Sequence, residues 1–292
     1  MQTTVKNWIE AARPKTLSAG LVPVLVGSAA AAHYGHFSWP IFLACLIGSL
    51  SIQVATNYIN DGSDFLRGAD THERIGPKRM AASGVFSPKA LFTAAGIFLF
   101  IACLTGLYLV QAAGLPILLV GIASIICAIA YTAGPFPLAY YGLGDIFVFL
   151  FFGLAAVGGT FFAHEKNINA AILLTAAIVG LHGIAILIVN NTRDVPTDSK
   201  TKKRTLSVRM GQKTSRYYFC IVLLLSFLLL APLSLQLGAK FLLPFLALPL
   251  ALRNAWLMLY ADTALEFNSL LAETAKLQLV IGLLLSISFL WV

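Results

Sequence analysis

The chain has 292 residues, of which 59% are hydrophobic and only 11% are charged, and its mean hydropathy is +0.85. Because soluble proteins carry about 25% charged residues, this composition excludes a water-soluble enzyme, a disordered chain and a nucleic-acid-binding protein. The net charge of +8 comes from basic residues in a few short segments between apolar runs, a distribution typical of membrane topology.

Apolar runs of about 17 to 25 residues, the length that crosses a bilayer as a helix, recur along the chain. They are continuously apolar, whereas the strands of a membrane barrel would alternate. The sequence therefore predicts an all-α integral membrane protein with about nine transmembrane helices in one bundle around a central cavity open to lipid. One domain is expected over residues 1–292. In chain order, the predicted spans are 17–33, 40–58, 90–110, 115–133, 143–163, 170–189, 217–237, 242–260 and 274–292.

Basic residues predict the orientation. Sixteen of the twenty Lys and Arg residues lie in the N-terminal segment and in or beside two long polar loops, predicted at 60–88 and 191–216. Both loops follow even-numbered spans, so they share one side with the N-terminus. The positive-inside rule then predicts the N-terminus inside and the C-terminus outside. We expect a multi-pass protein of a bacterial-type inner membrane, with both loops on the cytoplasmic side.

The same two loops hold most of the polar chemistry. Asn60 and Asp64 are four residues apart, as are Asp194 and Asp198, which places each pair on one helical face. Like charges held close repel unless a cation lies between them, and oxygen-only ligands select magnesium. Solvated salt bridges are the alternative for any one of these residues.

Basic residues are interspersed with these acids. Carboxylates and cations together suit a diphosphate bridged by Mg²⁺, because the acids hold the metal against phosphate oxygens while arginine and lysine neutralise the remaining charge. The candidate diphosphate-binding residues are Arg67, Lys78, Arg204 and Arg209.

Four stretches resemble a known family. They are ARPKTLSAGLVPVLVGSA from Ala12, NDGSDFLRGADTHERIGPKR from Asn60, YTAGPFPLAYYGLGD from Tyr131 and NNTRDVPTDSKTKKRTLSVRMG from Asn190. Together they resemble the UbiA superfamily of intramembrane prenyltransferases, and within it the branch that prenylates 1,4-dihydroxy-2-naphthoate in menaquinone synthesis. The resemblance extends over essentially the whole chain.

The resemblance implies a set of site residues. Asn60, Asp64, Asp194 and Asp198 would bind Mg²⁺, with Asp61 and Asp70 completing the first motif, and the catalytic residues would be Asp64, Asp194 and Asp198. The gap from Asp64 to Asp70 is longer than in the usual superfamily pattern, which favours the naphthoate branch over a 4-hydroxybenzoate acceptor.

Three further residues are candidates for binding the acceptor. Lys15 precedes the first span and could equally be a positive-inside anchor, and Tyr131 could equally belong to an aromatic belt. Asp145 enters a strongly apolar helix, where a carboxylate is a functional candidate by default.

The resemblance implies transfer of a polyprenyl group from polyprenyl diphosphate to 1,4-dihydroxy-2-naphthoate with loss of the carboxylate. The expected cofactor is Mg²⁺, and the expected partners are the two substrates and the lipid bilayer, with no nucleic acid and no obligatory protein partner. Two alternatives stay open: another acceptor within the superfamily, and a membrane transporter. The position of the acids near one surface argues against the transporter, whose sites usually lie at the midplane.

Overall fold

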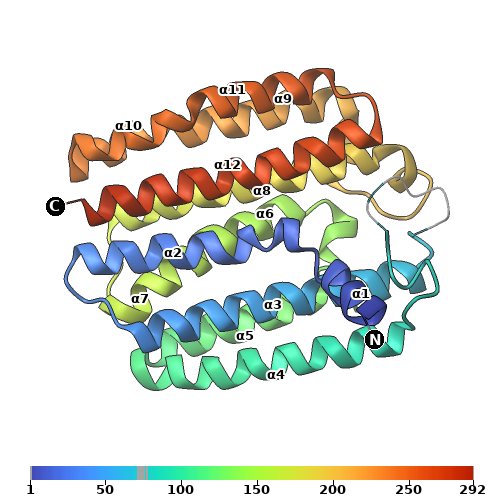
Figure 1. Cartoon of the computed structure of the whole chain (residues 1–292), viewed down its shortest axis with the longest axis horizontal. Helices are drawn as coiled ribbons and strands as arrows, with labels where there is room; N and C mark the ends of the chain where they lie inside the picture. Colours follow the sequence, from blue (N-terminus) through green and yellow to red (C-terminus); the bar gives the residue numbers. More distant parts are fainter. Residues whose placement is uncertain (1, 71–75, 77, 292) are drawn as a thin grey trace.

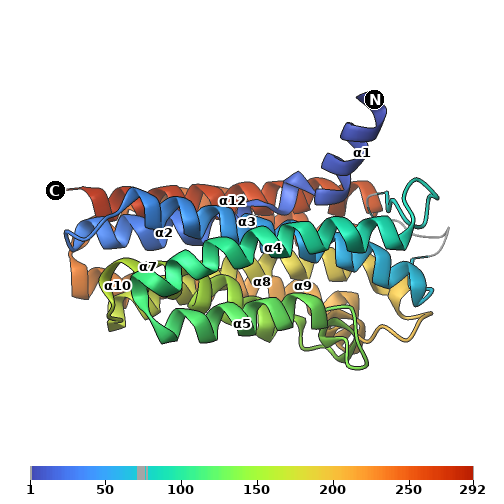
Figure 2. The ribbon, with the colours of Figure 1, turned by 90° about the horizontal axis from the view of Figure 1, so that it is seen from below.

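The computed structural model describes residues 2–70, 76 and 78–291, and these residues form helices with no strand among them. The long helices lie side by side in one elongated bundle, and consecutive ones run in opposite directions (Figures 1 and 2). The two termini lie toward opposite ends of this bundle (Figure 1). The predicted all-α class is confirmed.

The helical elements follow one another with short connections. In chain order they are α1 (Gln2–Ala12), η1 (Pro14–Thr16), α2 (Ser18–His33), α3 (Trp39–Leu66), α4 (Pro88–Ala113), α5 (Leu115–Ala130), η2 (Leu138–Tyr141), α6 (Gly144–Val148), the π-helical η3 (Phe149–Gly158), α7 (Gly159–Glu165), α8 (Ala170–Asp198), α9 (Leu206–Leu228), α10 (Leu230–Leu237), η4 (Ala239–Ala247), α11 (Leu248–Tyr260) and α12 (Ala264–Leu290).

Among the described residues, seven helical runs are long and apolar enough to cross a membrane. They are 39–66, 88–113, 144–165, 170–198, 206–237, 239–260 and 264–290. The bent pair formed by 4–16 and 18–33, with 55° between its halves, would be an eighth. α5 has 16 residues, fewer than the about 20 that usually span a bilayer core. The number nine and the orientation of the N-terminus therefore stay predictions.

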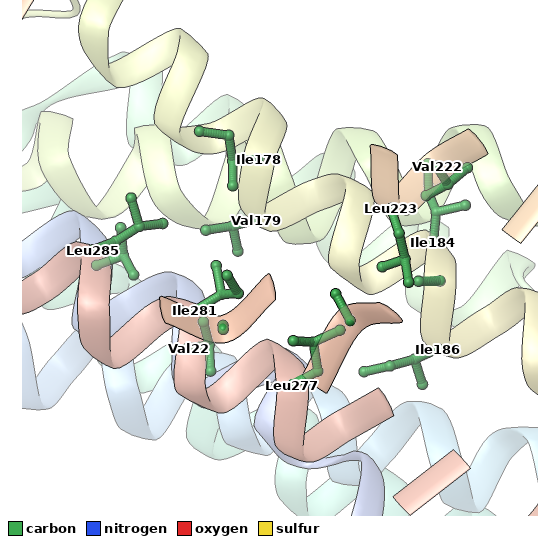
Figure 3. Packing of buried hydrophobic residues seen from close by; sticks show 14 of the residues in the cluster. Val22, Ile178, Val179, Ile184, Ile186, Val222, Leu223, Leu277, Ile281 and Leu285 are labelled. Carbon is green, nitrogen blue, oxygen red and sulfur yellow. The ribbon is translucent and has the colours of Figure 1, made fainter. Parts of the chain in front are cut away.

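The main core surrounds α8, the most buried of the seven runs. Ile178, Val179 and Ile184 on this helix pack with Val222 and Leu223 of α9 and with aliphatic residues of α2 and α12 (Figure 3). A helix that is apolar on every face is buried by neighbours on several sides, as α8 is here. α8 is therefore the central helix of the core, and its last turns carry the second acidic motif.

The two predicted polar loops are shorter than the apolar runs suggested. α3 continues through the first motif to Leu66, and α8 continues through the second to Asp198. A prediction from hydropathy ends each helix where its apolar run ends. In the structure the polar side chains that follow have partners in the bundle, so the helical backbone continues through them. The boundaries 60–88 and 191–216 were therefore wrong, and the motif residues up to Leu66 and Asp198 lie on helical turns.

Pro196 lies near the end of α8 and has no amide hydrogen to donate to the carbonyl of Thr192. The side-chain amide of Gln212 on α9 donates to that carbonyl at 3.1 Å. Gln212 can reach it because α9 bends at Gly211, whose φ of 78° is a left-handed conformation suited to glycine. The bend thus links α9 to the end of α8 that carries the acids.

Candidate active site

The acidic motifs, the loop after α5 and the loop between α8 and α9 meet at one end of the bundle (Figure 1). Asp64 on α3 and Asp198 on α8 are both buried there. Lys203, from the loop after α8, places its Nζ 3.5 Å from Asp198 Oδ2 and 3.9 Å from Asp64 Oδ2. One ammonium group therefore lies between carboxylates from the two motifs, which are far apart in the sequence.

Arg79 makes a second cationic bridge in the same cluster. Its Nη2 lies 3.3 Å from Asp64 Oδ2 and its Nε lies 3.2 Å from Asp70 Oδ2. All three side chains are buried, and buried charges are tolerated when they are paired in this way. The structure therefore brings together Asp64, Asp70 and Asp198, three of the predicted site residues.

The loop that follows α5 covers these acids. Tyr140 donates its hydroxyl to Asp64 Oδ1 at 2.9 Å, and Thr132 donates to Asn60 Oδ1 at 2.6 Å. Burial, together with the charge of the Asp64 carboxylate, raises the pKa of Tyr140 above its ordinary value. The phenol therefore stays protonated and remains a donor to Asp64.

Asp61 has a different environment from its neighbours in the first motif. Its two carboxylate oxygens accept hydrogen bonds from the backbone amides of Met80, at 2.9 Å, and Ala81, at 3.1 Å. Asp61 therefore fixes the segment that carries Arg79. This contact gives Asp61 an anchoring role that its place in the motif did not predict.

Asp194 pairs with an arginine that also reaches α12. Arg193 holds both of its oxygens, with Nε and Nη2 each 2.8 Å from an oxygen. The same guanidinium donates to Asn268 of α12 and to Asn190. Asp194 and Asp198 thus share a helix, but Asp194 pairs with Arg193 and Asp198 pairs with Lys203.

The four predicted diphosphate-binding residues have unlike surroundings. Arg67 donates to the carbonyls of Thr132 and Gly134, and Arg209 donates to those of Arg204 and Tyr141. Both guanidinium groups therefore hold loop backbone. The side chains of Lys78 and Arg204 are exposed at the same end of the bundle.

The three acceptor candidates are only partly brought together. The Tyr131 hydroxyl lies against Gly144, since a Cβ on that glycine would be 3.0 Å from it. Tyr131 is also within electrostatic reach of both Asp64 and Asp145. Asp145 is buried in the first turn of α6, whereas Lys15 is exposed in η1.

A largely apolar cavity of about 380 Å³ lies between α3, α4, α5 and the run α6–η3–α7. Tyr131 lines it, as do Gln53 and Thr56 of α3, so the cavity reaches the acidic end of the bundle. Leu107 and Ile122 also line it and are exposed on the outer face. The cavity therefore opens on an apolar face of the bundle, as the sequence predicted.

The donor set suits a hard divalent cation only in part. Among the described residues, no group of three or more His, Cys, Asp or Glu side chains is placed to hold a metal by itself. Two carboxylates with a cation already between them nevertheless match Mg²⁺, which commonly takes one or two protein carboxylates and completes its shell with waters and substrate phosphates. The residues fit a metal that binds together with a diphosphate.

Sequence reasoning did not single out three residues of this cluster: Arg79, Tyr140 and Lys203. Arg79 and Lys203 stand in basic runs whose other members are exposed, so composition could not separate them. Residues 71–75 and 77 of the first motif lie outside the described part of the chain.

These features define a helical membrane protein with an apolar cavity beneath a cluster of acids and cations. Residues 20–280 match the model of the UbiA prenyltransferase family. The chain belongs to this family, and it is therefore a membrane-embedded prenyltransferase, as its motifs predicted.

Relatives support this membership along nearly the whole chain. The 1,4-dihydroxy-2-naphthoate octaprenyltransferase of Haemophilus influenzae is 36% identical, with 98% of this chain and 96% of that protein covered. The Escherichia coli protein of the same name is 35% identical, over 95% of this chain and 92% of its own length. UbiA prenyltransferase domain-containing protein 1 of Xenopus tropicalis is 30% identical, over 95% and 79% of the two chains.

Solved structures share the fold. A UbiA homolog from Archaeoglobus fulgidus bound to GPP and Mg²⁺ matches with a TM-score of 0.66 and 15% identity, over 96% of this chain and 99% of the homolog. The same homolog bound to Cd²⁺ matches with a TM-score of 0.62. At this identity the likeness concerns the fold alone.

Proposed function

We propose that this enzyme transfers a polyprenyl group from polyprenyl diphosphate to 1,4-dihydroxy-2-naphthoate, with Mg²⁺ as cofactor and with loss of the ring carboxylate. The observation that carries the proposal is the Lys203 bridge between Asp64 and Asp198 at the acidic end of an apolar cavity. The names of the bacterial relatives support the acceptor, and the ligands of the archaeal homolog support the donor and the metal.

Oxygens of Asn60, Asp64, Asp194 and Asp198 would hold Mg²⁺ with the diphosphate, and the exposed Lys78 and Arg204 would neutralise remaining phosphate charge. The metal would supply charge neutralisation that makes diphosphate a better leaving group. Asp61 and Asp70 would act on the site through Arg79. Asp61 fixes the segment that carries Arg79, and Asp70 pairs with its guanidinium group.

The prenyl tail would lie in the apolar cavity, with its reactive carbon near Tyr131. Cleavage of the carbon–oxygen bond leaves both electrons on diphosphate and an allylic cation on the tail. The acceptor ring carbon that bears the carboxylate attacks this cation. Carbon dioxide then leaves without the electron pair of its bond, which restores the aromatic ring and gives a demethylmenaquinol. Tyr131 and Asp145, and Lys15 beyond them, would contact the acceptor.

The site would face the cytoplasm of a bacterial-type inner membrane, because the basic residues gather at the same end of the bundle. The whole chain would act as one domain. A different aromatic acceptor within the family is the second candidate, since the geometry of Tyr131 and Asp145 does not by itself distinguish naphthoate from benzoate.

The test uses purified full-length protein with MgCl₂, a polyprenyl diphosphate and 1,4-dihydroxy-2-naphthoate labelled in its carboxyl group. We expect labelled carbon dioxide to appear in step with prenylated product. 4-Hydroxybenzoate is the control acceptor. Prenylation of the benzoate with no reaction of the naphthoate would reject the acceptor and leave the diphosphate chemistry intact.

A further inference from the structure

Arg193 is a charged residue buried between the helices of a membrane protein. It lies near the end of α8 with 1% of its surface exposed. A buried charge is strongly destabilising unless ion pairs and hydrogen bonds compensate it. The partners of this guanidinium therefore indicate what it does, and they are Asp194, Asn268 and Asn190.

The contact with Asp194 has two parallel hydrogen bonds. Nε and Nη2 of Arg193 each lie 2.8 Å from one of the two carboxylate oxygens. Adjacent residues on a helix do not face each other, so both side chains must turn to meet. A two-pronged contact of this kind fixes the plane of a carboxylate as well as its position.

The remaining donors connect this pair to other parts of the bundle. Nη1 donates to Asn268 Oδ1 at 2.7 Å, and Nη2 also donates to Asn190 Oδ1 at 2.9 Å. Asn268 lies just after the start of α12, which Thr263 and Glu266 fix with a capping box. The guanidinium is thus held between two helices while it holds Asp194.

We propose that Arg193 is a positioning residue, which orients the Asp194 carboxylate toward the metal and the diphosphate and which itself depends on Asn268 of α12. The proposal rests on the magnesium-dependent function proposed above. Each carboxylate oxygen has a second lone pair beyond the one that Arg193 engages, so a fixed Asp194 can still accept a cation from its other side. Residues that orient ligating carboxylates typically contribute 10- to 100-fold to metal affinity.

The first test substitutes Arg193→Lys and measures Mn²⁺ binding by electron paramagnetic resonance, with geranyl S-thiolodiphosphate present. Lysine keeps the positive charge but cannot make two parallel hydrogen bonds to one carboxylate. We expect Mn²⁺ to bind at least tenfold more weakly, with a matching rise in the Mg²⁺ concentration needed for turnover. The control is Arg216→Lys, because Arg216 also joins helices at this end through carbonyls and Asp262.

The second test substitutes Asn268→Ala, which removes the support of Arg193 and leaves Asp194 and Arg193 in place. We expect a smaller loss of Mn²⁺ affinity, about threefold to tenfold, and an unchanged KM for the donor at saturating Mg²⁺. Asn254→Ala on α11 is the control, since Asn254 is a buried asparagine on another helix of the bundle. It should leave Mn²⁺ affinity unchanged.

Three outcomes would overturn the proposal. Unchanged Mn²⁺ affinity in both Arg193→Lys and Asn268→Ala, with normal binding by the unsubstituted protein, rejects the positioning role and leaves the proposed function standing. A rise in donor KM without a change in Mn²⁺ affinity would make Arg193 a diphosphate ligand. If the unsubstituted protein binds no Mn²⁺, the magnesium-dependent function fails, and the positioning role fails with it.

Discussion

Lys203 lies between Asp64 and Asp198, and its removal tests whether these acids form a cation site. The substitution Lys203→Met keeps an unbranched side chain of similar length and removes the ammonium group with its charge and its hydrogen-bond donors. It leaves two buried carboxylates, one from each motif, with no ammonium between them. We expect the metal-free protein to lose stability and Mg²⁺ to restore it.

The size of the effect follows from the geometry. The two carboxylate oxygens lie 3.9 Å and 3.5 Å from the same nitrogen, so they are at most about 7.4 Å apart. At an effective dielectric constant of about 20, unit charges at that separation repel by about 2 kcal/mol. The ammonium offsets this repulsion in the unsubstituted protein, and the methionine does not. A loss of this size lowers the melting temperature of a chain this long by about 4 °C.

The assay is thermal unfolding in detergent, with and without MgCl₂. Because a bound cation replaces the missing ammonium, Mg²⁺ should raise the melting temperature of Lys203→Met more than that of the unsubstituted protein. Lys202→Met is the matched control, since the side chain of Lys202 is exposed. Equal Mg²⁺ shifts in all three proteins would refute the inference that Asp64 and Asp198 share one cation.

Three further substitutions test other parts of the molecule. Asp64→Asn should abolish turnover without unfolding the protein, and full activity of the unsubstituted enzyme in EDTA would contradict the metal requirement. Lys78→Ala should raise the apparent KM for the diphosphate donor roughly tenfold. An unchanged donor KM would mean that this exposed lysine contributes only to the positive-inside orientation. Gly153→Ala should cost about 1 to 3 kcal/mol, because its Cβ would lie 2.6 Å from the carbonyl oxygen of Ala176. Gly121→Ala, with open space around it, is the control in thermal unfolding.

Local spacing in the sequence predicted the acidic helical faces well. Asn60 and Asp64 do lie on the last turns of one helix, and Asp194 and Asp198 on the last turns of another. Helix periodicity fixes which side chains share a face, and apolar runs indicate which segments can cross the membrane as helices. These two regularities were enough to predict an all-α bundle with acids at one end.

The partners of those acids were not predictable in the same way. Asp61 binds the amides of Met80 and Ala81, and every residue except proline offers an amide, so no pattern marks that contact. Arg67 and Arg209 were predicted to bind diphosphate, yet in the structure they donate to loop carbonyls. Only the path of the loops decides which cation meets a carboxylate and which meets backbone.

One face of α3 connects the cavity to the acids. Gln53, Thr56, Asn60 and Asp64 are spaced so that they follow one face of α3, and the first two line the cavity. At 1.5 Å per residue, the cavity wall at Thr56 lies about 12 Å along the helix axis from Asp64. A tail whose diphosphate binds near Asp64 must therefore pass Thr56.

The substitution Thr56→Phe places a bulky ring in that path. We expect it to lower kcat/KM for a long polyprenyl diphosphate at least tenfold more than for dimethylallyl diphosphate, whose five carbons end before Thr56. Ala123→Phe on α5 is the control, because Ala123 is exposed and does not line the cavity. Equal losses for both donors in Thr56→Phe would mean that the ring disturbs the acids themselves. Unchanged kcat/KM for both donors would place the tail outside this cavity, because Thr56 is part of the cavity wall.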